Sequence, residues 1–199
     1  MFDSTVYSNR RKALLEKMTA CRGLAVFVGN MDAAMNYRGN DYKFRQDSNF
    51  MYFWGIDEPA FAAIIDLDNG TECLYGNDVD IDDIIWMGPQ PSVASKGELV
   101  GCNTTAPLEA VRKVAAMDVD GGRHASEELV KAVVALRIVK EQCEIDEIDK
   151  ACDLGYLMHT EARRGCKPGV LEQEIVGRME GITLSKGWGV SFTTILSQN

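Results

Sequence analysis

Apolar and polar positions alternate along the first half of the chain in a way that predicts short elements of both types. Residues 8–20 predict a helix with Ser8 as its N-cap, because Ala13, Leu14 and Met18 lie on one helical face. Basic residues lie beside this apolar stripe. The helix is therefore expected to bury one face and to expose a basic one.

Three apolar runs that follow predict a sheet. Residues 23–30 end in Gly-Asn and indicate a buried strand, and residues 49–56 predict a second strand. Residues 60–76 predict a hairpin, because the Asp-Asn-Gly sequence at 68–70 tolerates the positive φ of a tight turn. Strands joined by such a turn are antiparallel, so the sheet is expected to be mixed rather than purely parallel.

The rest of the first half predicts a loop, a helix and a linker. Residues 77–92 predict an acidic loop that leads to Trp86 and a Gly-Pro turn. Residues 104–117 predict a helix with Pro107 near its first turn, where the missing N–H has little effect. The polar, glycine-rich residues 118–124 are the best linker candidate in the chain.

The second half is dominated by helical periodicity. Residues 126–165 predict one long or briefly interrupted helix, because apolar positions recur at spacings of three and four. The Lys-Pro-Gly sequence at 167–169 ends this pattern, and residues 170–187 predict a second helix. Residues 190–196 then predict a strand.

Composition and charge exclude several classes of protein. With 199 residues, 46% hydrophobic and 26% charged, the chain has the composition of a soluble globular protein of one or two domains. The net charge of −9 argues against nucleic acid as a partner. No signal peptide and no apolar run long enough to cross a membrane are evident. The six scattered cysteines predict reduced thiols and a cytoplasmic location.

Two clusters of potential metal ligands fail on spacing. Four aspartates at 78, 80, 82 and 83 suggest calcium, but Asp83 and Pro89 occupy the sixth and twelfth positions, where that loop needs glycine and glutamate. Cys152, His159 and Cys166 repeat every seven residues of a predicted helix. Each step advances about 10 Å, so the three cannot hold one zinc ion.

The residues alone provide no self-sufficient catalytic site. The chain has no GxSxG nucleophile elbow and no glycine-rich phosphate loop, and its two histidines, His124 and His159, have no evident Ser or Cys partner. The charged residues before the second predicted strand allow two interpretations: they pair to fix the loop, or they line a cleft or subunit contact. We favour the structural interpretation for this group, which comprises Arg38, Asp41, Arg45, Gln46 and Asp47.

Three stretches together resemble the N-terminal domain of aminopeptidase P, a family of Xaa-Pro aminopeptidases related to prolidase and creatinase. They read RRKALLEKM at 10–18, RGNDYKFRQDSNFMYFWGIDEPAFAAII at 38–65 and IIWMGPQPS at 84–92. The FRQxSxFxYxxG order in the second stretch is the most specific. Residues 135–175 resemble the entry into the catalytic "pita-bread" domain of the same family.

This resemblance implies the fold class and the domain division. The fold is expected to be α/β, with a mixed-sheet, creatinase-type N-terminal domain at residues 1–124. Residues 125–199 are expected to form a linker helix and the truncated start of a pita-bread α+β domain, including its first strand. Two departures from the family are a short stretch between Met117 and His124, and Val170-Leu171 in place of a hydroxyl N-cap.

The resemblance also implies metal-dependent chemistry outside this chain. Family members hold two divalent metal ions, commonly manganese, which activate a water to attack the peptide bond before proline. The family's metal ligands follow the strand that residues 190–196 resemble, so we expect no catalytic or metal-binding residue and no bound metal in this chain. It is expected to be inactive alone.

Partners and site residues follow from the same resemblance. The parent enzyme is expected to act on proline-containing peptides and to form a homo-oligomer. Trp86, Arg38, Asp41 and Arg45 are the candidates for substrate access or a subunit contact, and the alternative for Trp86 is an aromatic anchor that packs a loop.

Two other functions stay open. One is a stand-alone, non-catalytic oligomerisation or binding module, and the other is a fragment of a creatinase-like amidinohydrolase. The apolar stripes within residues 139–185 need a sheet to cover them, so residues 139–199 are expected to be unstable alone or to bury those stripes against another chain.

Overall fold

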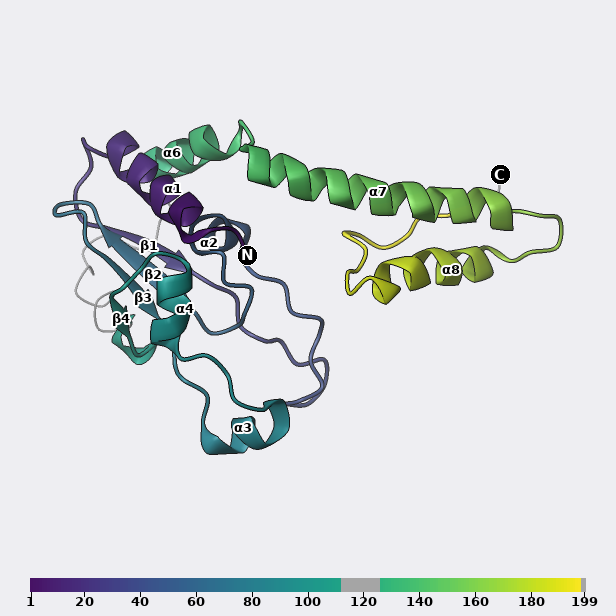
Figure 1. Cartoon of the computed structure of the whole chain (residues 1–199), viewed down its shortest axis with the longest axis horizontal. Coiled ribbons are helices and arrows are strands. Elements are labelled where there is room, and N and C mark those ends of the chain that lie inside the picture. The colour runs from purple at the N-terminus through teal and green to yellow at the C-terminus, as the bar shows by residue number, and fades with distance from the viewer. Residues whose placement is uncertain (112–125, 198–199) are drawn as a thin grey trace. The chain divides into compact units, whose positions relative to one another are not determined.

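A computed structural model describes residues 1–111 and 126–197 of the chain (Figure 1). The chain divides into two compact units, Met1–Val139 and Lys140–Asn199. The linker predicted at 118–124 lies outside the described residues, as do residues 112–117 of the helix predicted at 104–117. In the described part of that helix, residues 109–111 are helical and follow a short strand.

The first unit is built on a four-stranded sheet with the strand order β1-β2-β3-β4. The first two neighbouring pairs are antiparallel and β3 runs parallel to β4, so the predicted mixed sheet is confirmed. The hairpin between β2 and β3 is also confirmed, with Gly70 at φ 74° and its N–H bonded to the Asp66 carbonyl at 2.8 Å. The strands are β1 (Leu24–Val28), β2 (Ala62–Asp66), β3 (Glu72–Tyr75) and β4 (Thr105–Ala106).

Helix α1 (Ser4–Lys17) begins earlier than predicted. Asp3, not Ser8, is the N-cap: its carboxylate accepts the N–H of Thr5 at 2.9 Å. The Ser8 hydroxyl instead donates to the Thr5 carbonyl at 3.2 Å, inside the helix. The predicted basic face is wrong in part, because Arg10 and Arg11 are both buried.

Helix α2 (Ser48–Trp54) occupies the segment for which the sequence predicts a strand. The aromatic residues of this run favour a strand by propensity, but the caps at both ends favour a helix. The Asp47 carboxylate accepts the N–H groups of Asn49 and Phe50, each at 2.9 Å, and Gly55 ends the helix at φ 65°. Buried side chains on several sides of this helix hide its period from the sequence pattern.

Two further short helices interrupt the predicted acidic loop and the segment after it. α3 (Ile81–Met87) lies within residues 77–92, which the sequence predicts to be a loop. α4 (Val93–Leu99) follows it and was not predicted; the Ser92 hydroxyl caps this helix by accepting the N–H of Ser95 at 3.1 Å.

The main core of this unit lies between one face of the sheet and helices α1, α2 and α6 (Glu127–Arg137). Inward-facing Ala25 and Phe27 of β1 pack in it with Phe53 and Leu14, and α6 contributes Ala132 and Val133. Figure 1 shows α1 and α6 lying side by side over the sheet. A smaller apolar cluster on the opposite face contains Ala62, Ile64 and Tyr75.

The second unit is an antiparallel pair of helices, α7 (Gln142–Gly165) and α8 (Glu172–Ser185), as Figure 1 shows. The helix predicted at 126–165 is interrupted between Arg137 and Gln142, and the predicted break at 167–169 is confirmed, with Gly169 at φ 86°. The predicted strand at 190–196 is wrong, because residues 193–197 have no regular structure and no strand is described in this unit. A strand needs a hydrogen-bonding neighbour, and the described part of the unit offers none.

Gly55→Ala is expected to destabilise the first unit strongly. A Cβ at this position would lie 2.1 Å from Cζ of Tyr7, and the backbone of Gly55 has the left-handed conformation, with φ 65°. Left-handed backbone alone costs an alanine about 1–2 kcal/mol, and the overlap adds to it, so we expect a loss above about 3 kcal/mol in urea unfolding.

Gly70→Ala is the matched control, because Gly70 is also left-handed but its Cβ would meet only Cδ1 of Leu15 at 3.8 Å. Equal losses for the two variants would show that the contact with Tyr7 does not constrain position 55.

Candidate functional site

Trp86 lies on α3, and its side chain is exposed to solvent. The residue is 88% exposed, and Ile81, Ile85 and Met87 of the same helix are also exposed. Asp80 caps the start of α3 by accepting the N–H of Asp83 at 2.9 Å. Trp86 therefore does not anchor the loop by packing, as one interpretation of the sequence had it. Exposed apolar groups concentrated on one short segment are typical of a contact surface.

The other three candidate residues lie in the loop at residues 30–46. Within this loop, Ala34 and Asp41 form an isolated antiparallel β-bridge. The N–H of Met35 donates to the Asn40 carbonyl and the N–H of Tyr42 donates to the Ala33 carbonyl, each at 2.9 Å. The loop also exposes apolar side chains, among them Met31, Met35, Tyr37 and Tyr42.

The charged side chains of this loop do not pair as the structural interpretation expected. Arg38, Asp41 and Arg45 are all exposed, and within the described ranges no ion pair joins them. Nor does any described hydrogen bond or ion pair connect them with Trp86. The four candidates thus lie on two separate exposed segments, both in the first unit.

Gln46 and Asp47 hold the base of the loop. Gln46 is buried, and its Oε1 accepts the backbone N–H of Asn30 at 2.7 Å and that of Asp47 at 2.9 Å. Its Nε2 donates to the carbonyls of Ile56 and Glu58 at 3.1 and 2.7 Å. Together with the cap that Asp47 provides, these bonds give this part of the polar group a structural role.

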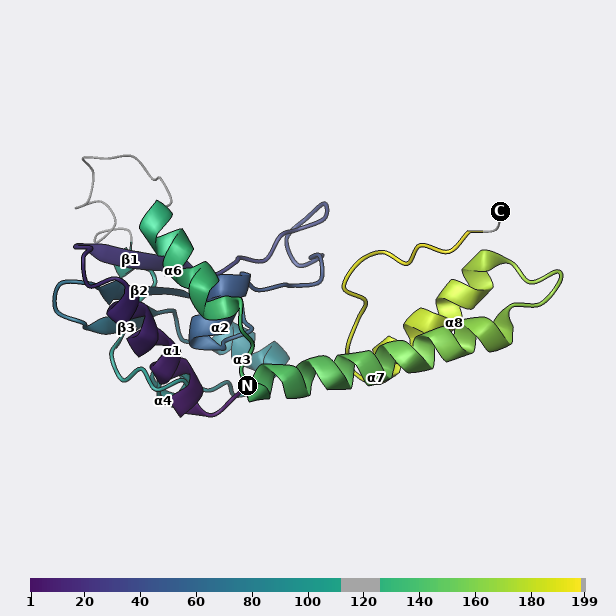
Figure 2. The same ribbon diagram turned by 90° about the horizontal axis from the view of Figure 1, so that it is seen from above.

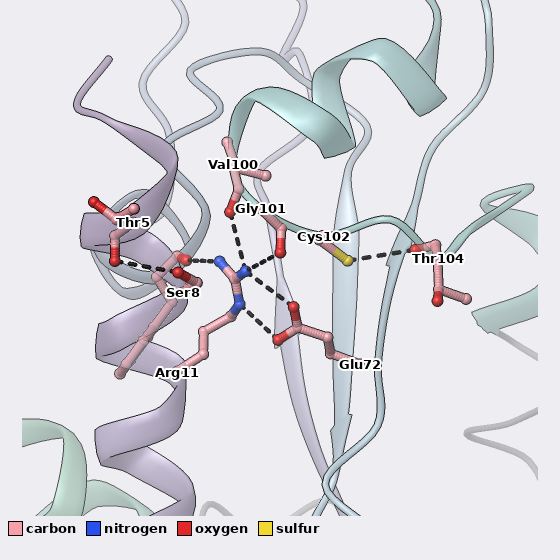
Figure 3. Close-up of polar contacts among 9 residues, drawn as sticks. Thr5, Ser8, Arg11, Glu72, Val100, Gly101, Cys102 and Thr104 are labelled. Carbon is pink, nitrogen blue, oxygen red and sulfur yellow. Dashed lines mark hydrogen bonds and ion pairs between the residues drawn. The ribbon is translucent and has the colours of Figure 1, made fainter.

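The polar centre of the first unit is Arg11, which sequence reasoning missed. The side chain is 1% exposed. Its guanidinium donates to both carboxylate oxygens of Glu72, from Nε at 2.7 Å and from Nη2 at 3.0 Å (Figure 3). It also donates to three carbonyls, those of Phe53, Val100 and Gly101, at 2.9 to 3.0 Å. Its Cζ lies 4.4 Å from the centre of the Trp54 ring.

Cys102 lies beside this ion pair and is fully buried. Its Sγ is 3.4 Å from the Thr104 carbonyl, the contact drawn in Figure 3. Burial, helped by the nearby Glu72 carboxylate, raises the pKa of the Cys102 thiol to about 11. Burial is also the main cause that raises the pKa of Tyr75 to about 12. Such groups stay protonated and inert at neutral pH.

Two aspartates of the acidic segment have structural roles. Asp78 accepts the backbone N–H of Val93 at 2.6 Å, and Asp80 caps α3. Among the side chains that the structure describes, no group of three His, Cys, Asp or Glu is placed to hold a metal ion. His124 lies outside the described ranges. The described residues therefore do not fit a two-metal centre.

No helix in the described part of the chain has the length and hydropathy needed to span a membrane. The six cysteines form no disulfide bond with one another, and Cys152 and Cys166 are exposed.

Comparison with known families gives one match over most of the first unit. Residues 7–126 match the family model described as "Aminopeptidase P, N-terminal domain". The Xaa-Pro aminopeptidase of Escherichia coli is 20% identical over an alignment of 210 residues, gaps included. The alignment covers 87% of this chain and 47% of that protein. A probable Xaa-Pro aminopeptidase of Ajellomyces capsulatus is 26% identical over 83% of this chain and 36% of its own length. The chain therefore spans between about a third and a half of these relatives.

Solved structures show the same fold. Aminopeptidase P of E. coli with the inhibitor Pro-Leu gives a TM-score of 0.76 at 19% identity, covering 94% of this chain and 50% of that one. Proline aminopeptidase P II from Yersinia pestis gives 0.74 at 20% identity. The predicted fold, a mixed α/β N-terminal domain followed by the start of the catalytic domain, is confirmed.

Arg11→Leu is expected to destabilise the first unit by about 3–5 kcal/mol, because it leaves the Glu72 carboxylate and three carbonyls without their donor. The free energy of unfolding in urea measures this. Arg22→Leu is the control: Arg22 and Asp68 form an exposed pair at 3.5 Å, whose loss costs under about 1 kcal/mol. Equal losses would contradict a central role for Arg11.

Cys102 is expected to resist alkylation in the folded protein at pH 8. A pKa raised from 9.0 to about 11 lowers its thiolate fraction about a hundredfold, and the side chain is buried. The raised pKa favours the fold below pH 9, and this contribution is lost as pH rises through 11. Iodoacetamide labelling read by peptide mass spectrometry should modify the exposed Cys152 and Cys166 in the native protein and Cys102 only after unfolding. Equal rates for Cys102 and Cys152 in the native protein would refute this.

Proposed function

This chain belongs to the family of the aminopeptidase P N-terminal domain, and from that membership we propose that it forms the cap domain and opening helices of a metal-dependent Xaa-Pro aminopeptidase. The match over residues 7–126 carries the proposal. The reaction is hydrolysis of the peptide bond between an N-terminal residue and proline. The substrates are proline-containing peptides, and the enzyme acts in the cytoplasm.

The chain itself has no proposed part in bond cleavage. The enzyme would use two divalent metal ions, manganese by preference, to polarise a water. The described residues do not fit such a centre, so we assign the metal ligands to the part of the relatives that this chain does not span. The 199-residue chain is accordingly proposed to be inactive alone.

The two exposed segments of the first unit support a role in substrate access or subunit contact. A cap that limits an active site to short peptides must present rigidly held side chains at the mouth of that site. α3 presents Trp86 between two capped ends, and the loop at 30–46 presents Arg38, Asp41 and Arg45 above a base held by Gln46. The homo-oligomer implied by the family would place such segments between subunits.

The alternative, a stand-alone oligomerisation module, draws support from the second unit. α8 buries Ile175 and Met179, whereas Ile145, Ile148 and Tyr156 of α7 stay exposed. Apolar groups left exposed along a helix can be covered by another copy as well as by a catalytic sheet. A creatinase-like amidinohydrolase is the other alternative, and it would share the cap domain but not the substrate.

Activity assays distinguish these functions. The chain alone, with Mn²⁺, is expected to release no amino acid from an Xaa-Pro peptide and to show no tight Mn²⁺ binding by calorimetry, because it lacks a ligand set. Joined to the remaining half of the E. coli enzyme, it is expected to restore Xaa-Pro hydrolysis but no hydrolysis of creatine. In that chimera, Trp86→Ala should change KM for long peptides more than for short ones.

Leu99→Ala is the control in the chimera, because Leu99 is an exposed apolar residue of α4 outside both segments. Chelator-sensitive turnover by the chain alone would refute the inactive-cap proposal. Hydrolysis of creatine instead of peptides by a folded chimera would favour the amidinohydrolase.

A further inference from the structure

Side-chain contacts hold the last turn of α6 against α2. The Tyr52 hydroxyl donates to the Leu136 carbonyl at 3.2 Å, and Nη1 of Arg137 donates to Oδ1 of Asn49. The Arg137 guanidinium also lies over the Tyr52 ring, with its Cζ 5.7 Å from the ring centre. Figure 2 shows the end of α6 next to α2. These contacts form the α6 latch, which comprises Asn49, Tyr52, Leu136 and Arg137.

The α2 side of the latch is fixed by the main core. Asn49 and Tyr52 lie at positions i and i+3 of the helix, so they share one face. Arg10 of α1, which is itself buried, donates from Nη1 to the Tyr52 carbonyl at 2.8 Å, and its Cζ lies 4.0 Å from the centre of the Tyr52 ring. Phe50 and Phe53 of the same helix are fully buried. The Tyr52 ring is therefore held in place independently of α6.

The packing of α6 itself is weaker. Its buried residues are Ala132 and Val133, both small, whereas the larger Leu129 and Leu136 are only partly buried against the core. Burial of apolar area is the main source of attachment for such a helix, and segments that bury little of it open locally at low cost. The end of α6 can therefore open while α1, α2 and the sheet stay folded, and the polar contacts of the latch weigh heavily in that equilibrium.

We propose that the α6 latch controls a local opening of the last turn of α6, and that this opening makes the peptide bond after Arg137 cleavable while the rest of the first unit stays folded. In the closed state the Ile138 N–H bonds to the Val134 carbonyl at 2.9 Å, and the Arg137 guanidinium is held by Asn49. The first unit ends at Val139, so the opening occurs where the chain leaves that unit. The device does not depend on the proposed peptidase activity.

A protease of trypsin-like specificity is the class of partner that the latch would control. Such an enzyme selects its cleavage site by binding a basic side chain in its S1 pocket. The residues after the bond, Ile138 and Val139, are already 67% and 75% exposed. The closed latch withholds the Arg137 side chain, because the same guanidinium cannot bind Asn49 and the protease pocket at once.

Limited trypsin cleavage of the full chain, followed by mass spectrometry, measures the opening. Trypsin adds water across the bond, which leaves a carboxylate on Arg137 and an amine on Ile138. When opening and closing are fast relative to cleavage, the cleavage rate reports the population of the open form. The bond after Lys43 is the internal reference, because Lys43 is exposed on the loop at residues 30–46.

Tyr52→Phe keeps the ring in the core and removes only the hydroxyl. The ratio of cleavage after Arg137 to cleavage after Lys43 should rise about three- to tenfold, because one buried hydrogen bond to α6 is lost. Hydrogen exchange of the Ile138 amide should accelerate by a similar factor, whereas exchange within α2 should not change. Tyr156→Phe is the matched control: Tyr156 lies on α7 and is 69% exposed, so the ratio should stay as in the original chain.

Asn49→Asp should act in the opposite direction. A carboxylate in place of the Asn49 amide makes the bond to Arg137 charge-assisted on both sides, which strengthens it. The cleavage ratio should therefore fall about threefold or more. A substitution that merely disturbed the packing of α2 would raise the ratio, so this variant separates the latch from a general loss of stability.

Three results would overturn the proposal. The first is a Tyr52→Phe variant whose cleavage ratio equals that of Tyr156→Phe. The second is a Tyr52→Phe variant in which cleavage after Arg137 and after Lys43 accelerate together, since the opening would then involve the whole unit. The third is an Asn49→Asp variant that is cleaved after Arg137 as fast as the original chain, which would show that the guanidinium is not withheld by residue 49.

Discussion

The Arg11 guanidinium is the interaction on which the rest of the first unit depends. A fully buried cation is tolerated only where its donors are matched, and here it meets one carboxylate and three carbonyls. The carbonyls come from the C-terminal ends of two seven-residue helices: Phe53 near the end of α2, and Val100 and Gly101 directly after α4. Helix C-termini carry partial negative charge, so both helices gain from pointing at the same cation. One side chain of α1 thereby fixes where α2, β3 and α4 meet.

This arrangement explains why the stretch from Phe44 to Pro59 contains so many polar groups. Asp47 starts α2, Gln46 bonds both to the end of β1 and to the chain after α2, and the aromatic residues between fill the core. The Phe53 carbonyl at the end of α2 then accepts from Arg11. Gln46 and Asp47 thus satisfy backbone groups that would otherwise be buried without partners. The stretch therefore connects the sheet to the helices that pack over it.

The sequence predicted elements whose signals are local and missed those that depend on distant partners. The hairpin around Gly70, the two helices of the second unit and the break at Gly169 follow from turn residues and periodicity, and all are confirmed. The aromatic run of α2 shows no helical period, because several of its faces are buried, and the sequence therefore predicted a strand where the caps Asp47 and Gly55 define a helix. The burial of Arg11 could not be predicted from the sequence, because its hydrogen-bond partners lie 42 to 90 residues away along the chain. For the candidate site, Trp86 and Arg38 were selected through the family pattern, and their exposure is a property of the fold that the sequence did not predict.

The exposed segments of the first unit differ in how the fold supports them. α3 and the loop at 30–46 extend from capped or hydrogen-bonded bases, so their exposed side chains can change without disturbing the Arg11 centre. β1 is different, because Ala25 and Phe27 pack in the main core while Val26 and Val28 are exposed on the other face. Alternation along one strand thus puts a core residue and an exposed residue one position apart. Substitutions at Val26 or Val28 therefore leave the main core intact, whereas a substitution at Phe27 acts directly on folding. Leu24, at the start of the same face, packs against the smaller apolar cluster and so contributes to folding as well.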